Sequence, residues 1–332
     1  MTGGQAQGRT TLGLLLMTYG SPATLEDVPA YLASTRGGRP APDDLVAEFR
    51  RRYALIGGSP LLRITREQAA ATAARLNQAA PPGTRFVATV GMRHAPPLIA
   101  DSLRDLTAQG AQRIGAVILS PQYSPYIMGG YHRAVDAALE AIPGVEVRVS
   151  TAWHLHPLFL DALAGRVQEA LARFPAGERE RVPVILTAHS LPRPVVDREP
   201  NYVEQLQETV RAVVDRCALS PRRWQFAYQS AGHTPEEWLK PDLKDVLPGL
   251  RATGHRDVLV VPVQFLADHL EILYDIDVAA GQEAREAGLR LHRIESLNTM
   301  PLFVDCLAAV ARETLGLPAE APVPVGAEVV RA

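Results

Sequence analysis

The chain has 332 residues, of which 47% are hydrophobic and 21% charged, and its formal net charge is -2 at pH 7. These values are typical of a globular protein with one or two large domains, and the low net charge gives no reason to expect nucleic acid as a partner. The only cysteines are Cys217 and Cys306, far apart and without a Cys-x-x-Cys motif. A four-cysteine zinc or iron–sulfur site and a disulfide framework are therefore excluded.

The N-terminal segment does not resemble a signal peptide or a membrane anchor. Residues 1–10 are rich in glycine and glutamine and lack the basic and apolar regions of a signal peptide. The apolar run 12–17 is too short to span a bilayer. We therefore expect a cytoplasmic protein without stable membrane insertion.

Apolar runs suited to buried strands recur along the chain, and helical patterns lie between most of them. The runs are 12–17, 86–90, 114–119, 145–149, 184–186, 225–228, 258–263 and 289–294. Apolar residues at three- and four-residue spacing predict helices at 69–77, 202–217 and 301–315. This alternation predicts parallel sheet with right-handed crossovers. Eight strands are compatible with one closed barrel or with two doubly wound halves of four strands.

Histidines gather at the ends of these strands. They are His94, His154, His189, His233 and His269. Ligands of open α/β sheets bind beyond the carboxyl ends of the strands, so these positions are candidates for a binding cleft.

The stretch 182–192 carries the clearest of these signals. Its apolar run reads as a strand buried on both faces and is followed by small and polar residues, His189 and then Pro192, which cannot continue a ladder. We expect His189 to project into the crevice with a free imidazole. The alternative is a core histidine that is bonded to a backbone carbonyl.

The stretch 265–277 follows another strand and opens a helix. Asp268 is a plausible N-cap, and Glu271 and Asp275 are four residues apart on one helix face. A solvated acidic face is the alternative. However, Glu271 lies in the first turn, close to the strand ends where His189 is expected. A histidine facing a carboxylate, with other positions open, suits Fe(II) and also suits acid–base chemistry.

Arginines and tyrosines in the first half indicate a different kind of binding. The segments 35–39 and 49–53 are rich in arginine, whose planar fork binds carboxylates. Together with Tyr19, Tyr53 and Tyr131 they fit a flat aromatic ligand that carries several carboxylates. The alternative is a solvated helix face covered by arginine stems.

Several common catalytic motifs are absent. There is no His-Glu-x-x-His, no Gly-x-Gly-x-x-Gly after a strand, no P-loop and no Gly-x-Ser-x-Gly. Zinc protease, dinucleotide dehydrogenase, P-loop NTPase and serine hydrolase activities therefore have no support.

Five motifs in a fixed order resemble those of a known family. They are Met-Thr-Tyr-Gly-Ser-Pro at 17–22, Ile-Gly-Gly-Ser-Pro-Leu at 56–61, Thr-Ala-His-Ser-Leu-Pro at 187–192, Gln-Ser-Ala-Gly-His-Thr-Pro at 229–235 with Trp238, and Phe-Leu-Ala-Asp-His-Leu-Glu-Ile-Leu-Tyr-Asp at 265–275. Over residues 13–315 the chain resembles a bacterial ferrochelatase, most closely the soluble coproporphyrin type of Gram-positive bacteria.

The resemblance implies an α/β fold of the class II chelatase kind and decides against the barrel. It implies two Rossmann-like domains, each a four-stranded parallel sheet flanked by helices, with the active-site cleft between them. We expect the first domain at 1–150, with the porphyrin-binding face, joined by a C-terminal helix at 301–316. The second domain is expected at 151–300, with the iron site, and 317–332 as a loose tail.

The same motifs imply roles for individual residues. His189 and Glu271 match the iron-site pair of the family, which is also the catalytic pair. Tyr19 matches a tyrosine that can ligate the product iron from the other face. The positions that match porphyrin-binding residues are Tyr19, Arg36, Arg52, Tyr53, Ser59 and Tyr131. The chain departs from the family in a shorter loop before Ser59 and in Ala279, where the family often continues its acidic helix face.

The implied function is insertion of Fe(II), a substrate, into a free-base porphyrin in haem biosynthesis. We expect porphyrin and ferrous iron as partners, a monomer, no nucleic acid, no organic cofactor and no iron–sulfur cluster. Coproporphyrin III is favoured, because four propionates need more donors than two, and Arg36, Arg39, Arg52 and Arg133 offer them. The segment 123–133 also has little of the exposed apolar area that a membrane-inserting lip needs.

Three alternatives remain beside this function. The substrate is protoporphyrin IX in the first, and a sirohydrochlorin-type ring that takes cobalt or nickel in the second. The third is a haem- or metal-binding protein without catalysis.

Overall fold

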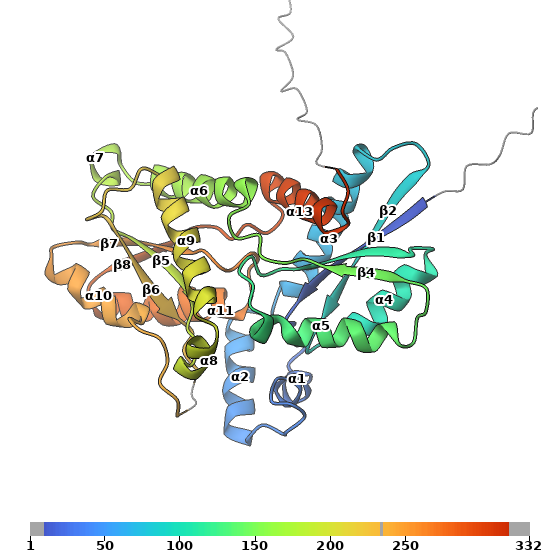
Figure 1. Cartoon of the computed structure of the whole chain (residues 1–332). Coiled ribbons are helices and arrows are strands. Elements are labelled where there is room, and N and C mark those ends of the chain that lie inside the picture. Colours follow the sequence, from blue (N-terminus) through green and yellow to red (C-terminus); the bar gives the residue numbers. More distant parts are fainter. Residues whose placement is uncertain (1–9, 233–234, 319–332) are drawn as a thin grey trace, which may run out of the picture.

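The computed structural model describes residues 10–232 and 235–318, and its strands form two separate four-stranded parallel sheets (Figure 1). The strands are β1 (Thr10–Thr18), β2 (Thr84–Met92), β3 (Arg113–Ile118), β4 (Glu146–Val149), β5 (Val184–His189), β6 (Trp224–Gln229), β7 (Asp257–Pro262) and β8 (Arg290–Arg293). Each predicted run overlaps one of them. The strand orders are β2-β1-β3-β4 and β6-β5-β7-β8, so the predicted fold class is confirmed and the barrel is wrong.

Helices flank both sheets. They are α1 (Val28–Thr35), α2 (Asp43–Leu55), α3 (Leu61–Gln78), α4 (Ile99–Ala108), α5 (Pro125–Leu139), α6 (Pro157–Ala172), α7 (Ala176–Arg179), α8 (Arg193–Arg198), α9 (Pro200–Arg216), α10 (Leu243–Ala252), α11 (Leu270–Leu273), the π-helix η1 (Asp275–Ala280), α12 (Gly281–Glu286) and α13 (Pro301–Thr314). The three predicted helices are parts of α3, α9 and α13. Helices α5, α6, α9 and α13 begin at a proline, whose fixed φ and missing N–H suit the first helical position.

Strand β1 shows why the central strands are continuous apolar runs. Leu12, Leu14 and Leu16 point into one core, and Leu15 and Met17 point into another on the opposite face of the sheet. Because successive side chains of a strand alternate between faces, a strand covered by helices on both sides has no polar face.

One hydrophobic core extends across both sheets. It contains Leu14 from β1, Leu186 from β5, and the buried rings of Phe159 and Phe303 from α6 and α13. Helix α13 packs against α3 and β3 of the first half and against α6 of the second (Figure 1). The predicted domain bounds at 150, 300 and 316 stay a prediction.

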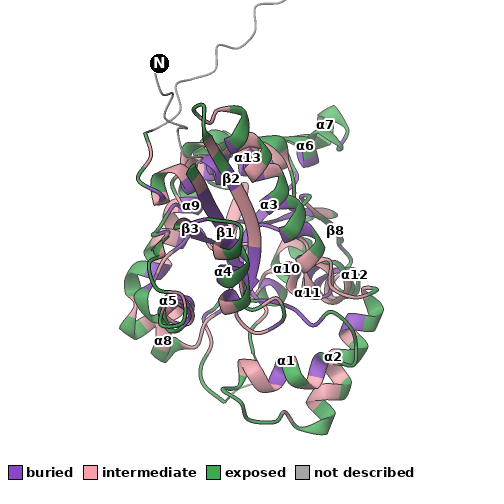
Figure 2. Cartoon of the chain, turned by 90° about the vertical axis from the view of Figure 1, so that its right-hand side faces the viewer, coloured by how far each residue is buried: buried purple, intermediate pink, exposed green. Residues whose placement is uncertain are grey.

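Helices α1 and α2 form a lobe that lies apart from the sheets (Figure 2). Val28, Leu32 and Tyr53 of this lobe pack against Leu270 and Tyr274 at α11. The lobe therefore contacts the segment that carries Glu271.

Some predictions lie outside the described residues. These predictions concern His233, most of the N-terminal segment 1–10 and the tail from 319 onward. None of the helices in residues 10–232 and 235–318 is long and apolar enough to cross a membrane.

Candidate active site

A cavity of about 450 Å³ lies at the carboxyl ends of the central strands of both sheets. In each sheet the chain leaves the first strand for a neighbour on one side and returns for a neighbour on the other. Such a switch leaves a crevice beyond the strand ends, where ligands of α/β sheets bind. The cavity is lined by residues within 18–21, 119–131, 189–191 and 264–271, which follow β1, β3, β5 and β7. The two crevices therefore share one cavity.

Five tyrosine rings line the cavity, together with aliphatic, phenylalanine and small polar side chains. The tyrosines that line it are Tyr19, Tyr31, Tyr53, Tyr131 and Tyr202. Burial raises the pKa of Tyr53 and of Tyr202 to about 12, and it also raises the pKa of Tyr19, Tyr31 and Tyr131. The rings are therefore neutral at physiological pH. Flat, uncharged walls of this kind suit a flat aromatic ligand.

Glu271 lies between two histidines at one end of this cavity. Its Oε1 is 3.8 Å from Nε2 of His189, and its Oε2 is 3.6 Å from Nε2 of His269. The side chains of His189, His269 and Glu271 are 29%, 19% and 37% exposed, and all three line the cavity. The structure thus brings the predicted catalytic pair together, and it adds His269.

The charges of this cluster are coupled. Burial opposes ionisation of Glu271, but His189 and His269 outweigh it and lower the pKa of the carboxyl to about 2. Burial likewise opposes the charged form of His269, yet its contact with Glu271 raises the pKa of that imidazole. Glu271 is therefore ionised at neutral pH, and His269 binds a proton more readily than an isolated histidine.

Backbone carbonyls orient both imidazoles. Nδ1 of His189 donates to the carbonyl of Ser190, and Nδ1 of His269 donates to the carbonyl of Ala267 at 3.0 Å. Because a carbonyl only accepts, Nδ1 carries the hydrogen, and in the neutral ring Nε2 holds the lone pair. The prediction of a free imidazole is wrong for Nδ1 of His189. Its Nε2, by contrast, faces Glu271 in the cavity.

Glutamine side chains hold the backbone of the pair. The backbone N–H of His189 donates to Oε1 of Gln264 at 2.9 Å, while Nε2 of Gln264 donates to the hydroxyl of Tyr202. Nε2 of Gln229 donates to the carbonyl oxygen of Glu271 at 3.0 Å. The predicted catalytic pair is thus anchored through its main chain, and both side chains line the cavity.

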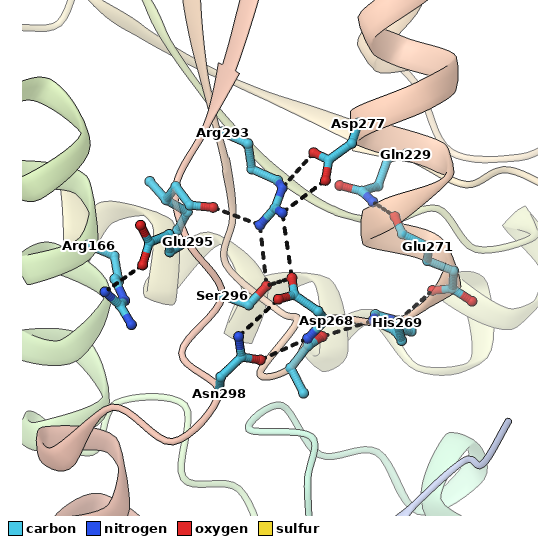
Figure 3. Close-up of polar contacts among 12 residues, drawn as sticks. Arg166, Gln229, Asp268, His269, Glu271, Asp277, Arg293, Glu295, Ser296 and Asn298 are labelled. Atoms are coloured by element: carbon cyan, nitrogen blue, oxygen red, sulfur yellow. Dashed lines mark hydrogen bonds and ion pairs between the residues drawn. The ribbon is translucent and has the colours of Figure 1, made fainter. Parts of the chain in front are cut away.

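The predicted N-cap role of Asp268 is wrong, because His269 occupies the N-cap position of α11. Asp268 instead accepts hydrogen bonds from Ser296 Oγ at 2.7 Å and from Asn298 Nδ2 at 2.9 Å, and Arg293 lies 3.5 Å away (Figure 3). The loop after β8 competes for this carboxylate, and its donors hold the side chain away from the first turn of the helix.

The second carboxylate of the acidic stretch, Asp275, lies at the start of the π-helix η1. It accepts a hydrogen bond from Ser230, and its pKa is raised, chiefly by burial and also by the charge of Glu271. Asp275 is not among the residues that line the cavity. The helix that was expected to carry both carboxylates changes from α-helix to π-helix at Asp275, and the charge of Glu271 still acts on Asp275.

The predicted porphyrin-binding residues divide into two groups. Tyr19, Tyr53 and Tyr131 line the cavity, whereas Arg36, Arg52 and Ser59 do not.

The second group lies on or beside the helical lobe. Arg36 is exposed at the end of α1, and Arg52 binds Glu48 at 2.8 Å and stacks 4.9 Å from the ring centre of Tyr274. Oγ of Ser59 accepts from the backbone N–H of Leu61 at 3.4 Å. Their predicted contacts with a porphyrin stay a prediction.

Sequence reasoning missed one charged residue of the cavity wall, Arg93. It directly follows β2, so its place after a strand was the available signal. The ring of its neighbour His94 lies tilted against that of Tyr19, with ring centres 4.4 Å apart, and its Nδ1 forms a hydrogen bond with Oγ of Ser34. Burial, helped by the charge of Arg93, lowers the pKa of His94 to about 4, so that this imidazole is neutral.

Within residues 10–232 and 235–318, no group of three or more histidine, cysteine, aspartate and glutamate side chains is arranged to hold a metal ion. Both cysteines are free thiols, Cys306 buried and Cys217 half-buried.

Sequence comparison identifies related proteins. The model of a family described as ferrochelatase matches residues 11–315. A ferrochelatase of Deinococcus radiodurans is 41% identical over 301 residues, which cover 90% of this chain and 94% of that protein. A coproporphyrin III ferrochelatase of Geobacillus kaustophilus is 36% identical over 304 residues (91% and 95%), and that of Bacillus subtilis is 33% identical over 310 residues (93% and 99%).

Structural comparison finds chelatase folds. The structure described as SirB from Bacillus subtilis with Fe3+ has a TM-score of 0.58 at 12% identity and covers 92% of this chain and 96% of its own. DR2241 from Deinococcus radiodurans, described as having structural similarity to chelatases, has a TM-score of 0.54 at 15% identity, with coverage of 92% and 55%. At such identities these likenesses concern the fold alone.

Proposed function

The chain belongs to the ferrochelatase family, and from this premise we propose that it inserts Fe(II) into coproporphyrin III. Family membership makes it a metal chelatase that acts on a porphyrin in haem synthesis. The observation that carries the proposal is the ionised Glu271 between two imidazoles at the end of a tyrosine-walled cavity. Relatives that are named coproporphyrin III ferrochelatase support the choice of porphyrin.

The reaction needs a cation-binding group that also accepts protons. A free-base porphyrin carries two N–H protons in its centre, and insertion of Fe(II) releases both of them. We assign both protons in turn to the Nε2 lone pair of His189, which faces the cavity and passes the first proton to water before it accepts the second. The carboxylate of Glu271 lies 3.8 Å from that nitrogen and stabilises the imidazolium that forms. The same two atoms attract Fe(II) before it enters the ring.

The remaining cavity residues bind and orient the macrocycle. In our proposal the rings of Tyr19, Tyr53 and Tyr131 contact the porphyrin, and Tyr19 approaches the iron from the face opposite His189. Arg36, Arg52 and Ser59 bind propionates outside the cavity, since guanidinium groups bind carboxylates with two parallel hydrogen bonds. Binding energy from these contacts would offset the distortion that exposes the pyrrole nitrogens.

We further propose a cytoplasmic monomer that uses no organic cofactor, no iron–sulfur cluster and no nucleic acid. Two unpaired thiols support a reducing compartment. The net charge of -2 gives no electrostatic footprint for nucleic acid.

Competition between two porphyrins tests the proposed substrate. Purified protein is supplied anaerobically with Fe(II) and equal concentrations of coproporphyrin III and protoporphyrin IX, without detergent. We expect a higher kcat/KM for coproporphyrin III, followed by the absorbance of each metalloporphyrin. A preference for protoporphyrin IX would overturn the proposed substrate. If no metalloporphyrin forms, the proposed activity is overturned, and this is the result expected of a protein that only binds haem or metal.

A double variant tests the catalytic pair. His189→Ala/Glu271→Ala should lower kcat by a factor on the order of 100 or more, because both the proton acceptor and its counter-charge are removed. Porphyrin binding, measured by fluorescence, should persist. The matched control is His255→Ala/Glu286→Ala, which removes the same residue types away from the cavity lining. Turnover of the first variant equal to that of the control would place the iron site elsewhere.

A further inference from the structure

We infer that Arg93 binds a carboxylate of the porphyrin inside the cavity and thereby selects a substrate with carboxylates on more than one edge. This inference rests on the proposed function. It concerns a residue that lines the same cavity as Glu271 but comes from the other sheet, directly after β2.

The charge of Arg93 is unusual for the wall that contains it. Among the described residues that line the cavity, it is the one arginine, and no lysine lines it. Its side chain makes no ion pair with a carboxylate within residues 10–232 and 235–318. Its contacts are two ring faces, with Cζ 5.9 Å from the ring centre of Tyr19 and 5.8 Å from that of Tyr131. Ring faces attract the charge but leave its N–H donors for another partner.

A glycine makes room for the guanidinium. A Cβ atom at Gly130 would lie 2.1 Å from Cζ and 2.3 Å from Nε of Arg93, so only glycine allows the group to lie against helix α5. At the preceding position, a Cβ at Gly129 would approach only the flexible side chain of Arg133, at 3.1 Å. The Arg93 backbone N–H donates to the carbonyl of Thr18 at 3.0 Å, which fixes the base of the side chain.

The guanidinium is thus held by two tyrosine rings and a helix backbone, and it also lines the cavity. A planar fork held in this way is preorganised for a planar anion, and a carboxylate accepts two parallel hydrogen bonds from it. The porphyrin side chains supply that group. A second role, in which Arg93 merely holds the two rings, would not depend on the charge of the ligand.

The position of Arg93 relative to Arg52 carries the specificity. Arg52 belongs to α2 and stacks on Tyr274, whereas Arg93 lies on the α5 side between Tyr19 and Tyr131. The two propionates of protoporphyrin IX lie on adjacent pyrroles, and its opposite edge carries vinyl groups. In coproporphyrin III the opposite edge carries propionates as well. In our inference Arg52 and Arg93 bind propionates at opposite edges of the ring, an arrangement that only the second pattern provides.

Four variants test the inference by fluorescence titration of metal-free porphyrin, alongside kcat and KM. Arg93→Met removes the charge and keeps the stem, Arg93→Lys keeps the charge without the fork, and Gly130→Ala keeps Arg93 but displaces its guanidinium. Gly165→Ala, a glycine of helix α6 whose added Cβ would meet only Cε of Met300 at 3.6 Å, is the control. The probes are coproporphyrin III, protoporphyrin IX, which has propionates on one edge only, and the tetra-amide of coproporphyrin III, which has the same ring without carboxylates.

We expect Arg93→Met and Gly130→Ala to raise the Kd for coproporphyrin III at least about tenfold and that for protoporphyrin IX less, with Arg93→Lys intermediate and Gly165→Ala unchanged. The Kd for the tetra-amide should stay unchanged in all of them, a difference that a ring-holding role would not produce. Equal losses for both probes, or an unchanged Kd for the acid in Arg93→Met, would overturn the inference. If Arg93→Met unfolds, Gly130→Ala decides, because alanine favours the helix. A parent protein that neither binds nor metallates porphyrin would instead overturn the proposed function.

Discussion

At the scale of single residues, the ionised state of Glu271 depends on its two histidine neighbours. Oε1 faces His189 and Oε2 faces His269, so that each oxygen has one imidazole. His189 comes from β5 and lies at the end of a strand, while His269 immediately precedes α11. We therefore regard His269 as a positioning residue that holds Glu271 ionised while His189 exchanges protons.

Replacing His269 by asparagine should raise the pKa of Glu271. Asparagine can still donate a hydrogen bond to a carbonyl, but it carries no charge. Only His189 then remains to counter the effect of burial, which raises the pKa of the carboxyl. The pKa should move from about 2 toward 4.5, the ordinary value, and ¹³C NMR of the carboxyl carbon can follow it down to pH 3. Glu271→Gln assigns the signal. A carboxyl that stays fully ionised at pH 3 in His269→Asn would contradict this role.

The same shift predicts the sign of a stability change. Since the folded-state pKa of Glu271 lies below 4.5, its ionisation stabilises the parent above that pH, and this stability is lost as the pH falls toward 2. Between pH 4.5 and pH 2 the free energy of unfolding should therefore fall less in His269→Asn than in the parent. Urea unfolding at several pH values measures this difference. His255, which lies outside the cavity lining, provides the control variant His255→Asn.

At the scale of elements, the segment after α11 is shaped by a π-helix. The N–H of Ala279 donates to the carbonyl of Tyr274 at 2.8 Å, five residues back, in place of an α-helical bond. Such wide turns are rare and are frequently found at functional sites. Here the π-helix begins at Asp275, four residues after Glu271.

Arg293, at the end of β8, ties this π-helix to the loop before α11. Its Nε and Nη2 donate to both oxygens of Asp277, at 2.8 and 3.0 Å, and it lies 3.5 Å from Asp268 (Figure 3). The side chain is only 14% exposed. One guanidinium therefore holds both flanks of the segment that presents Glu271.

Arg293→Met should destabilise the protein and lower kcat together. It leaves the carboxylates of Asp268 and Asp277 without their shared cation, which costs about 1–3 kcal/mol of unfolding free energy. The control is Arg290→Met, which breaks the pair with Asp257 where Arg290 is 71% exposed. That pair should contribute less than about 1 kcal/mol. Equal losses in urea unfolding, or a parental kcat in Arg293→Met, would contradict the role of Arg293.

At the scale of the whole molecule, the cavity depends on a core that both halves share. Leu14 and Leu186, from the central strands of the two sheets, belong to one cluster with Phe159 and Phe303. Hydrogen bonds also join the halves between the loop after β3 and helix α9, where the backbone N–H of Tyr123 donates to Gln205 at 2.8 Å and Gln205 donates back to the carbonyl of Tyr123 at 2.9 Å. The two cavity walls are therefore held at a set separation.

A shared core predicts that the two halves unfold together. Urea unfolding of the parent should give one transition that is the same by near-UV and far-UV circular dichroism. Phe303→Ala should cost about 3–5 kcal/mol, because it leaves a void in that core. Leu155→Ala, at an exposed apolar position, should cost little. Two separate transitions in the parent would show that the core does not couple the halves.

The sequence by itself determined the strands, three of the helices and the pair His189 and Glu271. These features depend on local patterns. A strand buried on both faces must be apolar throughout, a buried helix face repeats at three and four residues, and strand ends in parallel sheets gather at one edge. The family motifs predicted the fold class and the activity because each motif is a short continuous segment that can be read from the sequence alone.

Only the tertiary structure decided the contacts between distant residues. Three of these contacts depend on how the segments pack. Glu271 pairs with His269, Asp268 binds the loop after β8 and does not cap α11, and Arg52 lies outside the cavity lining. Arg93 and Gly130 are the clearest case, because nothing in the sequence of either segment indicates that one makes room for the other. Such contacts depend on how packed elements are aligned with one another. That alignment involves side chains from separate parts of the chain, and local periodicity carries no information about it.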